Sequence, residues 1–207
     1  MYQYIKRILD IILGIIALIL LSPIMIITSV LIRIDSKGPI IFKQQRVGKD
    51  GKHFTIYKFR TMVENAEKIG TGLDSYENDT RVTKIGKFLR NSSLDEFPQL
   101  FNILKGDMSF VGPRPPVTYH PYKYDDYPVD AKRRFEVRPG VTGYAQVNGR
   151  NELSWEEKFK YDLYYVDKVC LLLDLKIFIL TIFKVIKMEG SYDLKQNTKE
   201  KSTSLNQ

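Results

Sequence analysis

The chain has few of the side chains that bind soft metals or form cross-links. Its 207 residues include one cysteine, Cys170, and two histidines, His53 and His120. A single cysteine excludes a disulfide within the chain, which is typical of a reducing compartment. Zinc sites are built mostly from cysteine and histidine, so any metal is expected to have oxygen ligands, as magnesium and manganese do.

Acidic side chains are outnumbered by basic ones. The 24 Asp and Glu residues stand against 32 Lys and Arg, which gives a formal net charge of +8. An excess of this size favours an anionic partner, a class that includes nucleic acid, a phospholipid surface and a phosphorylated substrate. The length fits one globular domain with an appendage, and such a domain is large enough to bury a core.

Charge is missing altogether from one long segment near the N-terminus. The 22 residues 11–32 contain no charged side chain, and about 20 apolar residues suffice for a helix that crosses a bilayer. A signal peptide is disfavoured, because its apolar region is typically about 7–15 residues long and ends at a small-residue cleavage site.

Two features favour a re-entrant helix over a simple crossing. Ser22 and Pro23 lie in the middle of the segment, where the proline removes a backbone donor and the serine hydroxyl can satisfy the freed carbonyl. Both flanks are basic, so under the positive-inside rule both ends favour the cytoplasm. These flanking residues are Lys6, Arg7, Arg33 and Lys37. We therefore predict a helix broken at Ser22 and Pro23; the alternative is an ordinary kinked transmembrane helix.

The remaining pattern predicts a helix-dominated α+β fold with a small β-hairpin. Residues 40–45 and 53–59 are expected to be strands, with the tight-turn pair Asp50-Gly51 between them. Helices are expected over residues 62–69, 82–90, 94–104, 154–168 and 171–188. The domains are then a membrane anchor over 1–37, a globular domain over 38–188 and a polar, disordered tail over 189–207.

Two of the expected helices are amphipathic. On helix 171–188 the polar residues gather within one arc, opposite a continuous apolar side. That pattern predicts a helix lying in the membrane interface, although packing against a core gives the same pattern. The polar residues are Asp174, Lys176, Thr181, Lys184 and Lys187. Helix 82–90 has a basic face, which is typical of solvated surface but could also lie against anionic headgroups.

Adjacent carboxylates, Asp95 and Glu96, lie where helix 94–104 is expected to begin. Ser93 and Glu96 match a capping box, so the pair has a purely structural interpretation. The same pair could hold a hard divalent cation or attack an electrophilic phosphorus. Arg114 follows in a rigid proline-rich loop, and its guanidinium can bind phosphate oxygens in a bidentate fork.

Two glycine-containing loops follow, at residues 138–143 and 148–151. Loops of this kind can bring backbone N–H groups close to an anion. Ordinary turn chemistry explains a single such loop equally well.

Taken together and in order, these motifs resemble the bacterial sugar transferases that act as small monotopic phosphoglycosyl transferases. The shared motifs are KFRTM at 58–62, SLDEFPQL at 93–100, KGDMS at 105–109, VGPRP at 111–115, RPGVTG at 138–143 and GR at 149–150. The resemblance covers about residues 1–188 and includes the apolar segment with Ser22 and Pro23. The extra multi-spanning N-terminal region of larger relatives is missing, so we expect the minimal form of the family.

The resemblance implies a membrane enzyme at the start of glycoconjugate assembly. Such enzymes move a sugar-1-phosphate from a UDP-sugar to polyprenyl (undecaprenyl) phosphate and release UMP. The expected partners are those two substrates and membrane lipids, without nucleic acid, at the cytoplasmic face of the bacterial plasma membrane. The product would start a capsule, an exopolysaccharide, an O-antigen or a glycoprotein glycan.

The resemblance also implies roles for individual residues. Asp95 would be the nucleophile that forms a covalent phosphosugar intermediate, and Glu96 would help to hold the metal or manage a proton. Mg²⁺, or Mn²⁺ in its place, would bind at these two carboxylates. The residues expected to bind substrate phosphates are Lys58, Arg60, Arg114, Arg138 and Arg150.

General chemistry agrees with these roles. Displacement at a diphosphate needs its negative charge neutralised by a metal and arginines, and a carboxylate nucleophile is already ionised at neutral pH. Two alternatives stay open. The chain could be a membrane-tethered basic domain that binds anionic lipid or nucleic acid without catalysis, or an enzyme with direct one-step transfer in which Asp95 is only a base or metal ligand.

Overall fold

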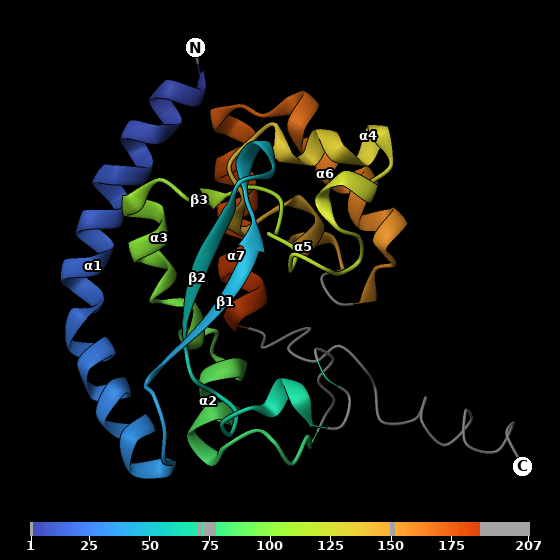
Figure 1. Cartoon of the computed structure of the whole chain (residues 1–207). Coiled ribbons are helices and arrows are strands. Elements are labelled where there is room, and N and C mark those ends of the chain that lie inside the picture. Colours follow the sequence, from blue (N-terminus) through green and yellow to red (C-terminus); the bar gives the residue numbers. More distant parts are fainter. Residues whose placement is uncertain (1, 70–71, 73–77, 150–151, 187–207) are drawn as a thin grey trace, which may run out of the picture.

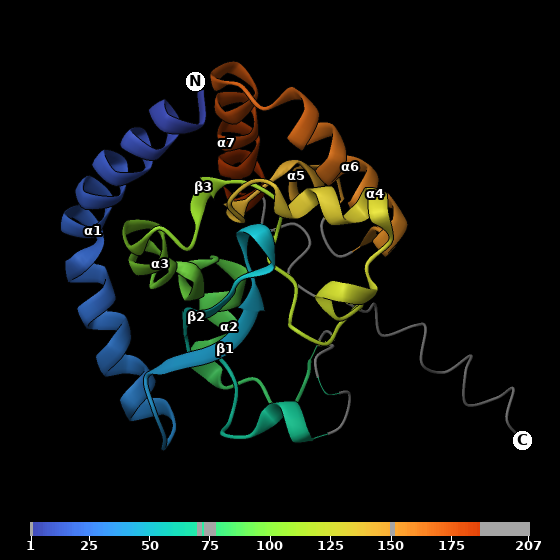
Figure 2. The same ribbon diagram turned by 45° about the horizontal axis from the view of Figure 1, so that its top comes forward.

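The computed structural model describes residues 2–69, 72, 78–149 and 152–186, and it shows the predicted helix-dominated α+β fold (Figure 1). A long N-terminal helix, α1, lies along one side of the body, and α3, Gln99–Lys105, lies between it and a β-hairpin. Helices α4, α5 and α6 lie on the other side of the hairpin in both views (Figures 1 and 2).

Helix α1, Tyr2–Asp35, is 34 residues long and continues through Ser22 and Pro23, where the sequence predicts a break. Both views show it bowed around the body (Figures 1 and 2). Because Pro23 has no N–H, the carbonyl of Ile19 loses its helical partner. The Ser22 hydroxyl donates to that carbonyl at 2.8 Å, so the expected compensation by Ser22 is confirmed.

The surface of α1 is apolar on the outside and partly polar on the inside. Its buried positions are Lys6, Asp10, Gly14, Thr28 and Ile32. Fifteen large hydrophobic side chains along the helix, from Tyr4 to Ile34, are exposed. Among the described helices, α1 alone is long and apolar enough to cross a membrane by length and composition.

Polar contacts attach the N-terminal half of α1 to the body. Lys6 forms a salt bridge with Asp174 at 2.5 Å, and Tyr2 and Tyr165 donate hydrogen bonds to the same carboxylate. Asp10 accepts hydrogen bonds from the Ser109 hydroxyl and the Phe110 amide. Buried charges need such partners, so these contacts fix the rotation of α1 about its own axis.

The predicted hairpin is confirmed. Strands β1, Ile41–Val47, and β2, His53–Phe59, pair antiparallel in a register from Ile41 opposite Phe59 to Val47 opposite His53. The connection holds Asp50 and Gly51 at φ 54° and φ 75°, in the left-handed region that this turn requires.

A second, parallel pair was not predicted. Strand β3, Ser109–Val111, pairs with β4, Gly140–Thr142, so residues 138–143 are partly strand rather than loop. A Cβ on Gly140 would lie 2.1 Å from the amide nitrogen of Gly112, and one on Gly143 would lie 2.1 Å from the Gly112 carbonyl oxygen. The glycines are therefore required because the two segments approach backbone to backbone.

Several helix bounds differ from the prediction. Only Ala66–Lys68 is helical within 62–69, as the 3₁₀ turn η2. The predicted helix 94–104 is divided at Pro98 into the 3₁₀ turn η3, Leu94–Glu96, and α3, Gln99–Lys105. The remaining helical elements are α2 Lys84–Asn91, η4 Tyr124–Asp126, α4 Val129–Lys132, η5 Arg133–Phe135, α5 Tyr144–Asn148, α6 Trp155–Lys168 and α7 Leu171–Ile186. The predicted capping box at the start of α6 is present.

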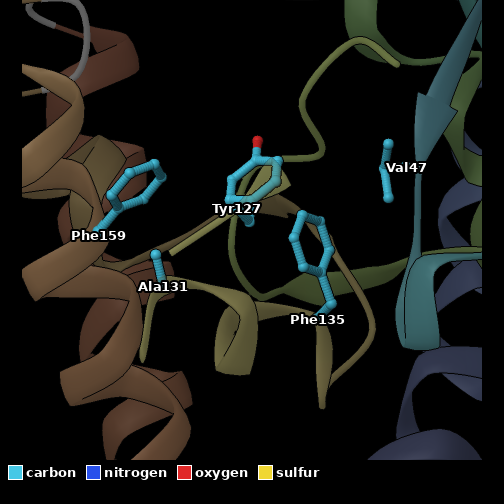
Figure 3. Close-up of a cluster of buried hydrophobic side chains, with 5 residues drawn as sticks. All are labelled: Val47, Tyr127, Ala131, Phe135 and Phe159. Atoms are coloured by element: carbon cyan, nitrogen blue, oxygen red, sulfur yellow. The ribbon is translucent and has the colours of Figure 1, made fainter. Parts of the chain in front are cut away.

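A buried apolar cluster joins the end of the hairpin to α4 and α6 (Figure 3). Its members are Val47, Tyr127, Ala131, Phe135 and Phe159. The rings of Tyr127 and Phe135 meet edge to face with centroids 5.0 Å apart, a preferred aromatic geometry. The cluster holds β1 and α6 in fixed relative positions.

Helix α7 turns Asp174 and Thr181 toward the body, whereas Lys176 and much of the apolar surface of the helix are exposed. Asp174, which was expected on a polar outer face, is buried, and the Thr181 hydroxyl contacts that of Thr142 at 2.6 Å. Ile177 is fully buried beside them. Exposed apolar side chains are Leu171, Leu172, Leu175, Phe178, Ile179, Ile182 and Phe183. Asp174 is buried because it is the shared acceptor for Tyr2, Lys6 and Tyr165.

Candidate functional site

The Asp95–Glu96 pair lies in η3, directly after a reversal of the chain at Ser93. Ser93 has φ 57°, in the left-handed region, and its side chain makes no capping hydrogen bond within the described residues. The capping-box interpretation of Ser93 and Glu96 is therefore wrong. The two carboxylates are held by other partners.

Lys58, from strand β2, is the first of these partners. Its Nζ lies 2.7 Å from Glu96 Oε1 and 3.6 Å from Asp95 Oδ2. The three side chains are between 12% and 15% exposed, so solvent screens their interaction only weakly. Lys58 thereby neutralises part of the negative charge of two adjacent carboxylates.

Arg114 is the second partner, with Nη2 at 3.1 Å from Glu96 Oε1. Its loop is held by the parallel strand pair: the Gly112 amide donates to Thr142 O at 2.8 Å, and the Gly140 amide donates to Pro113 O at 3.0 Å. The Arg114 carbonyl accepts a hydrogen bond from Arg134 Nη2 at 3.0 Å. The Arg114 side chain is 40% exposed, which leaves it accessible to a ligand.

Burial raises the pKa of Asp95 above its ordinary value of 3.8. The positive charge of Lys58 acts in the opposite direction, and the negative charge of Glu96 adds to the rise. Unlike a surface aspartate, Asp95 therefore has a pKa that depends on its burial and on the charges of Lys58 and Glu96.

The pair opens into a cavity of about 650 Å³, a size typical of small-molecule sites. Among the described residues, eight Lys and Arg side chains and five Asp and Glu side chains line it, so this lining is positive overall. An anionic ligand such as a diphosphate suits this balance.

Of the predicted phosphate-binding residues, the structure brings Lys58, Arg60 and Arg114 to this cavity. Arg60 is 5% exposed and donates through Nη2 to both the backbone carbonyl and the hydroxyl of Ser36. It thus also fixes the C-terminal end of α1 to the hairpin.

Arg138 and Arg150 are placed differently. Arg138 Nε donates to the carbonyl of Gly106 at 3.0 Å, which ties β4 to the end of α3. Arg138 is not among the described residues that line the cavity. Arg150 lies outside the residues that the structure describes.

The cavity also contains residues that the sequence pattern did not assign to a phosphate-binding site. Arg90, expected on a basic outer face, donates to the Thr61 hydroxyl at 3.0 Å and lines the cavity, whereas Lys84 and Lys87 are exposed. Arg46, His120, Arg134, Gln146, Trp155, Lys158 and Asp162 line it as well. Tertiary contacts bring these residues to the cavity. Nothing in the sequence indicated their positions beyond the excess of positive charge in the chain.

Comparison with known proteins gives one family and several similar chains. The family model described as bacterial sugar transferase matches residues 1–188. An uncharacterized sugar transferase, EpsL of Bacillus subtilis, is 45% identical, over 96% of this chain and 95% of its own length.

Two longer relatives have more specific names. The UDP-glucose:undecaprenyl-phosphate glucose-1-phosphate transferase of Klebsiella pneumoniae is 45% identical over 90% of this chain. The UDP-N-acetylgalactosamine-undecaprenyl-phosphate N-acetylgalactosaminephosphotransferase of Aeromonas hydrophila is 42% identical over 90% of this chain. The chain spans 41% and 44% of the lengths of these two proteins.

The interaction between Lys58 and Asp95 can be tested by titration. In protein labelled with ¹³C-aspartate, we expect the carboxyl carbon of Asp95, assigned with Asp95→Asn, to titrate above pH 3.8. Lys58→Gln removes the charge that favours the ionised form, so it should move this titration to higher pH. Lys43→Gln, an exposed change on the neighbouring strand, is the control and should leave it in place. An unchanged midpoint in Lys58→Gln would contradict the assigned interaction.

Proposed function

The chain belongs to the bacterial sugar transferase family, and from that premise we propose that it transfers a sugar-1-phosphate from a UDP-sugar to polyprenyl phosphate. The second product is UMP. One observation carries the proposal: a largely buried carboxylate pair, which Lys58 bridges and of which Arg114 contacts Glu96, opens into a cavity whose described lining is positively charged. The named transferases among the relatives act with undecaprenyl phosphate and UDP-sugars, which supports these two substrates. The lipid-linked product would start a capsule, exopolysaccharide, O-antigen or glycoprotein glycan.

The proposed reaction has two displacements, both at the phosphorus that bears the sugar. In the first, a carboxylate oxygen of Asp95 attacks this phosphorus, the bond to the bridging oxygen breaks, and UMP leaves with the bonding electrons. In the second, a phosphate oxygen of the lipid attacks the same phosphorus and the aspartyl bond breaks. The net result is polyprenyl-diphosphate-sugar, and Asp95 is a free carboxylate again.

Other residues of the site would prepare these steps. Lys58 favours the ionised form of Asp95, because its positive charge opposes the rise in pKa that burial causes. Arg114 faces Glu96 and is partly exposed, so it can also bind phosphate oxygens of either substrate. Glu96 holds Lys58 and Arg114 in place through one carboxylate oxygen.

We also propose Mg²⁺, or Mn²⁺, at Asp95 and Glu96. Within the described residues, no group of three or more His, Cys, Asp or Glu side chains could hold a metal. Magnesium is commonly bound by one or two carboxylates together with substrate phosphates, so a carboxylate pair beside a diphosphate fits that chemistry. When bound, the ion would neutralise charge that develops on the phosphate oxygens.

The membrane arrangement is proposed from the exposed apolar surfaces. Helix α1 and the outer side of α7 expose large hydrophobic residues in numbers that water disfavours. Embedding α1 as a re-entrant helix, with α7 in the interface, would keep both ends of α1 in the cytoplasm and hold the cavity near the headgroup of the lipid acceptor. Binding of nucleic acid or lipid alone would leave the buried carboxylate pair without a role.

Asp95→Asn tests the proposed nucleophile. The amide cannot form the aspartyl intermediate, so UMP release from a UDP-sugar in the presence of polyprenyl phosphate should fall by roughly 10³-fold or more. Asp130→Asn, an exposed change on α4, should retain full activity. Circular dichroism should show that both variants are folded. Near-normal UMP release by Asp95→Asn would end the nucleophile proposal.

Metal removal tests the proposed ion. Extensive EDTA treatment should abolish UMP release, and added Mg²⁺ or Mn²⁺ should restore it because both ions prefer oxygen ligands. A zinc or calcium salt at the same free concentration serves as the comparison. Full activity of the metal-depleted enzyme would contradict the proposal.

Cysteine labelling tests the proposed topology. In a Cys170→Ser background, Gln3→Cys reports the N-terminus and Lys123→Cys, at an exposed position, reports the body. If α1 is re-entrant, an impermeant thiol reagent should label neither variant in intact cells and both after permeabilisation. Labelling of Gln3→Cys in intact cells would show that α1 crosses the membrane.

A further inference from the structure

We infer that the part of the cavity bounded by α5 and α6 binds the uracil base of the nucleotide donor, through Gln146, Trp155 and Asp162. This inference rests on the proposed function, because it takes a uridine nucleotide as the ligand. The three residues line the same cavity as Asp95 and Glu96. They come from elements on the far side of the hairpin from α1 and α3 (Figures 1 and 2).

Asp162 presents a buried acceptor that has no partner within the described residues. Its side chain is 2% exposed. Oδ2 accepts from Arg134 Nε at 2.9 Å and lies 2.7 Å from Arg134 Nη2, while Oδ1 has no hydrogen bond. A buried acceptor without a donor costs free energy, so a donor supplied by a bound ligand would stabilise this arrangement.

Gln146 presents a second acceptor of the same kind. Its Nε2 donates to the carbonyl of Val141 at 3.1 Å, which fixes the orientation of the amide. Its Oε1 is buried and has no partner in the described part of the chain. The chemistry of this part of the cavity therefore calls for a ligand with an N–H or O–H donor.

Phosphate groups do not meet that requirement. A phosphate dianion offers only acceptors, and it would be repelled by the carboxylate of Asp162. Uracil offers a donor, N3–H, between two carbonyl acceptors, and it carries no charge. Sugar hydroxyls also supply donors without charge, but an aromatic ring beside the two acceptors favours a flat base, and the diphosphate fits nearer to Lys58 and Arg114.

Trp155 adds a flat aromatic ring to this part of the cavity, with Lys158 Nζ over it at 4.8 Å from the ring centroid. It is half-buried at the start of α6, and its ring meets His120 edge to face with centroids 5.6 Å apart. Its indole N–H donates to His120 Nε2 at 3.3 Å, which fixes the ring plane. Stacking of a base on such a ring contributes to affinity whatever the base.

Arg134 connects the proposed base site to the catalytic residues. Its Nε and Nη2 bind Asp162, and Nη2 also donates to the carbonyl of Arg114 at 3.0 Å. Its guanidinium lies over the rings of Phe135 and Phe159, which belong to the apolar cluster in Figure 3. Arg134 is thus a positioning residue, because it contacts both Asp162, which would bind the base, and the backbone of Arg114.

Calorimetric titration of the full-length protein in lipid nanodiscs tests the inference with three probes: UMP, CMP and glucose 1-phosphate. With position 3 of the base facing Asp162, the wild type should bind UMP more tightly than CMP, since uracil has a donor at N3 and cytosine has an acceptor there. Gln146→Leu and Asp162→Asn should weaken UMP binding about tenfold and remove the preference for UMP. Trp155→Leu should weaken UMP and CMP binding alike. Lys160→Gln, an exposed change on α6, is the control and should bind as the wild type does.

Two results would overturn the base site. One is unchanged UMP affinity in both Gln146→Leu and Trp155→Leu, which decides the matter even if Asp162→Asn does not fold. The other is weaker binding of glucose 1-phosphate with UMP binding intact, which would assign this part of the cavity to the sugar. Binding of UMP needs no transfer, so loss of UMP binding in the variants upholds the base site even if UDP-sugar turnover fails.

Discussion

The candidate site depends on Glu96, whose Oε1 lies 2.7 Å from Lys58 Nζ and 3.1 Å from Arg114 Nη2. One carboxylate oxygen thereby joins three segments that are far apart in the sequence: the hairpin, the turn η3 and the loop after β3. A buried carboxylate is retained only when cations and donors surround it. Satisfying Glu96 therefore also places Lys58 beside Asp95 and Arg114 at the cavity, and this arrangement gives an aspartate the surroundings of a nucleophile.

Buried charges need partners, and this rule explains why α1 and α7 bury charged side chains and expose apolar ones. Lys6 on α1 binds Asp174 on α7, which also accepts hydrogen bonds from two tyrosines, and Asp10 on α1 accepts a hydrogen bond from Ser109. Because these charged groups take inner positions, many large apolar residues of both helices remain outside. In water that surface would be unfavourable, whereas in a bilayer it is the surface that lipid tails contact. Polar contacts to the body and apolar contacts to the membrane are thus complementary parts of one anchor.

The sequence predicted elements with a strong local signal. The hairpin with Asp50 and Gly51, the capping box of α6 and the apolar segment in α1 all depend on neighbouring residues. The sequence-based prediction was wrong where long-range contacts determine the local structure. Ser93 reverses the chain instead of capping a helix, Asp174 is buried by partners from α1 and α6, and residues 138–143 pair with β3. Within the site, motifs identified Asp95, Glu96, Lys58 and Arg114, but Arg134 and Asp162 are brought to the cavity by packing, which spacing does not encode.

The central claim is that Asp95 carries the phosphosugar between donor and acceptor. It is tested most directly by mixing the enzyme with a UDP-sugar labelled at the sugar-bearing phosphate, without polyprenyl phosphate, and quenching in acid. The account predicts release of about one UMP per enzyme and a phosphosugar adduct that peptide mass spectrometry places on Asp95. Added polyprenyl phosphate should then remove the adduct. Release of UMP only when the lipid acceptor is present, with no label on the protein, would contradict the account and favour direct one-step transfer.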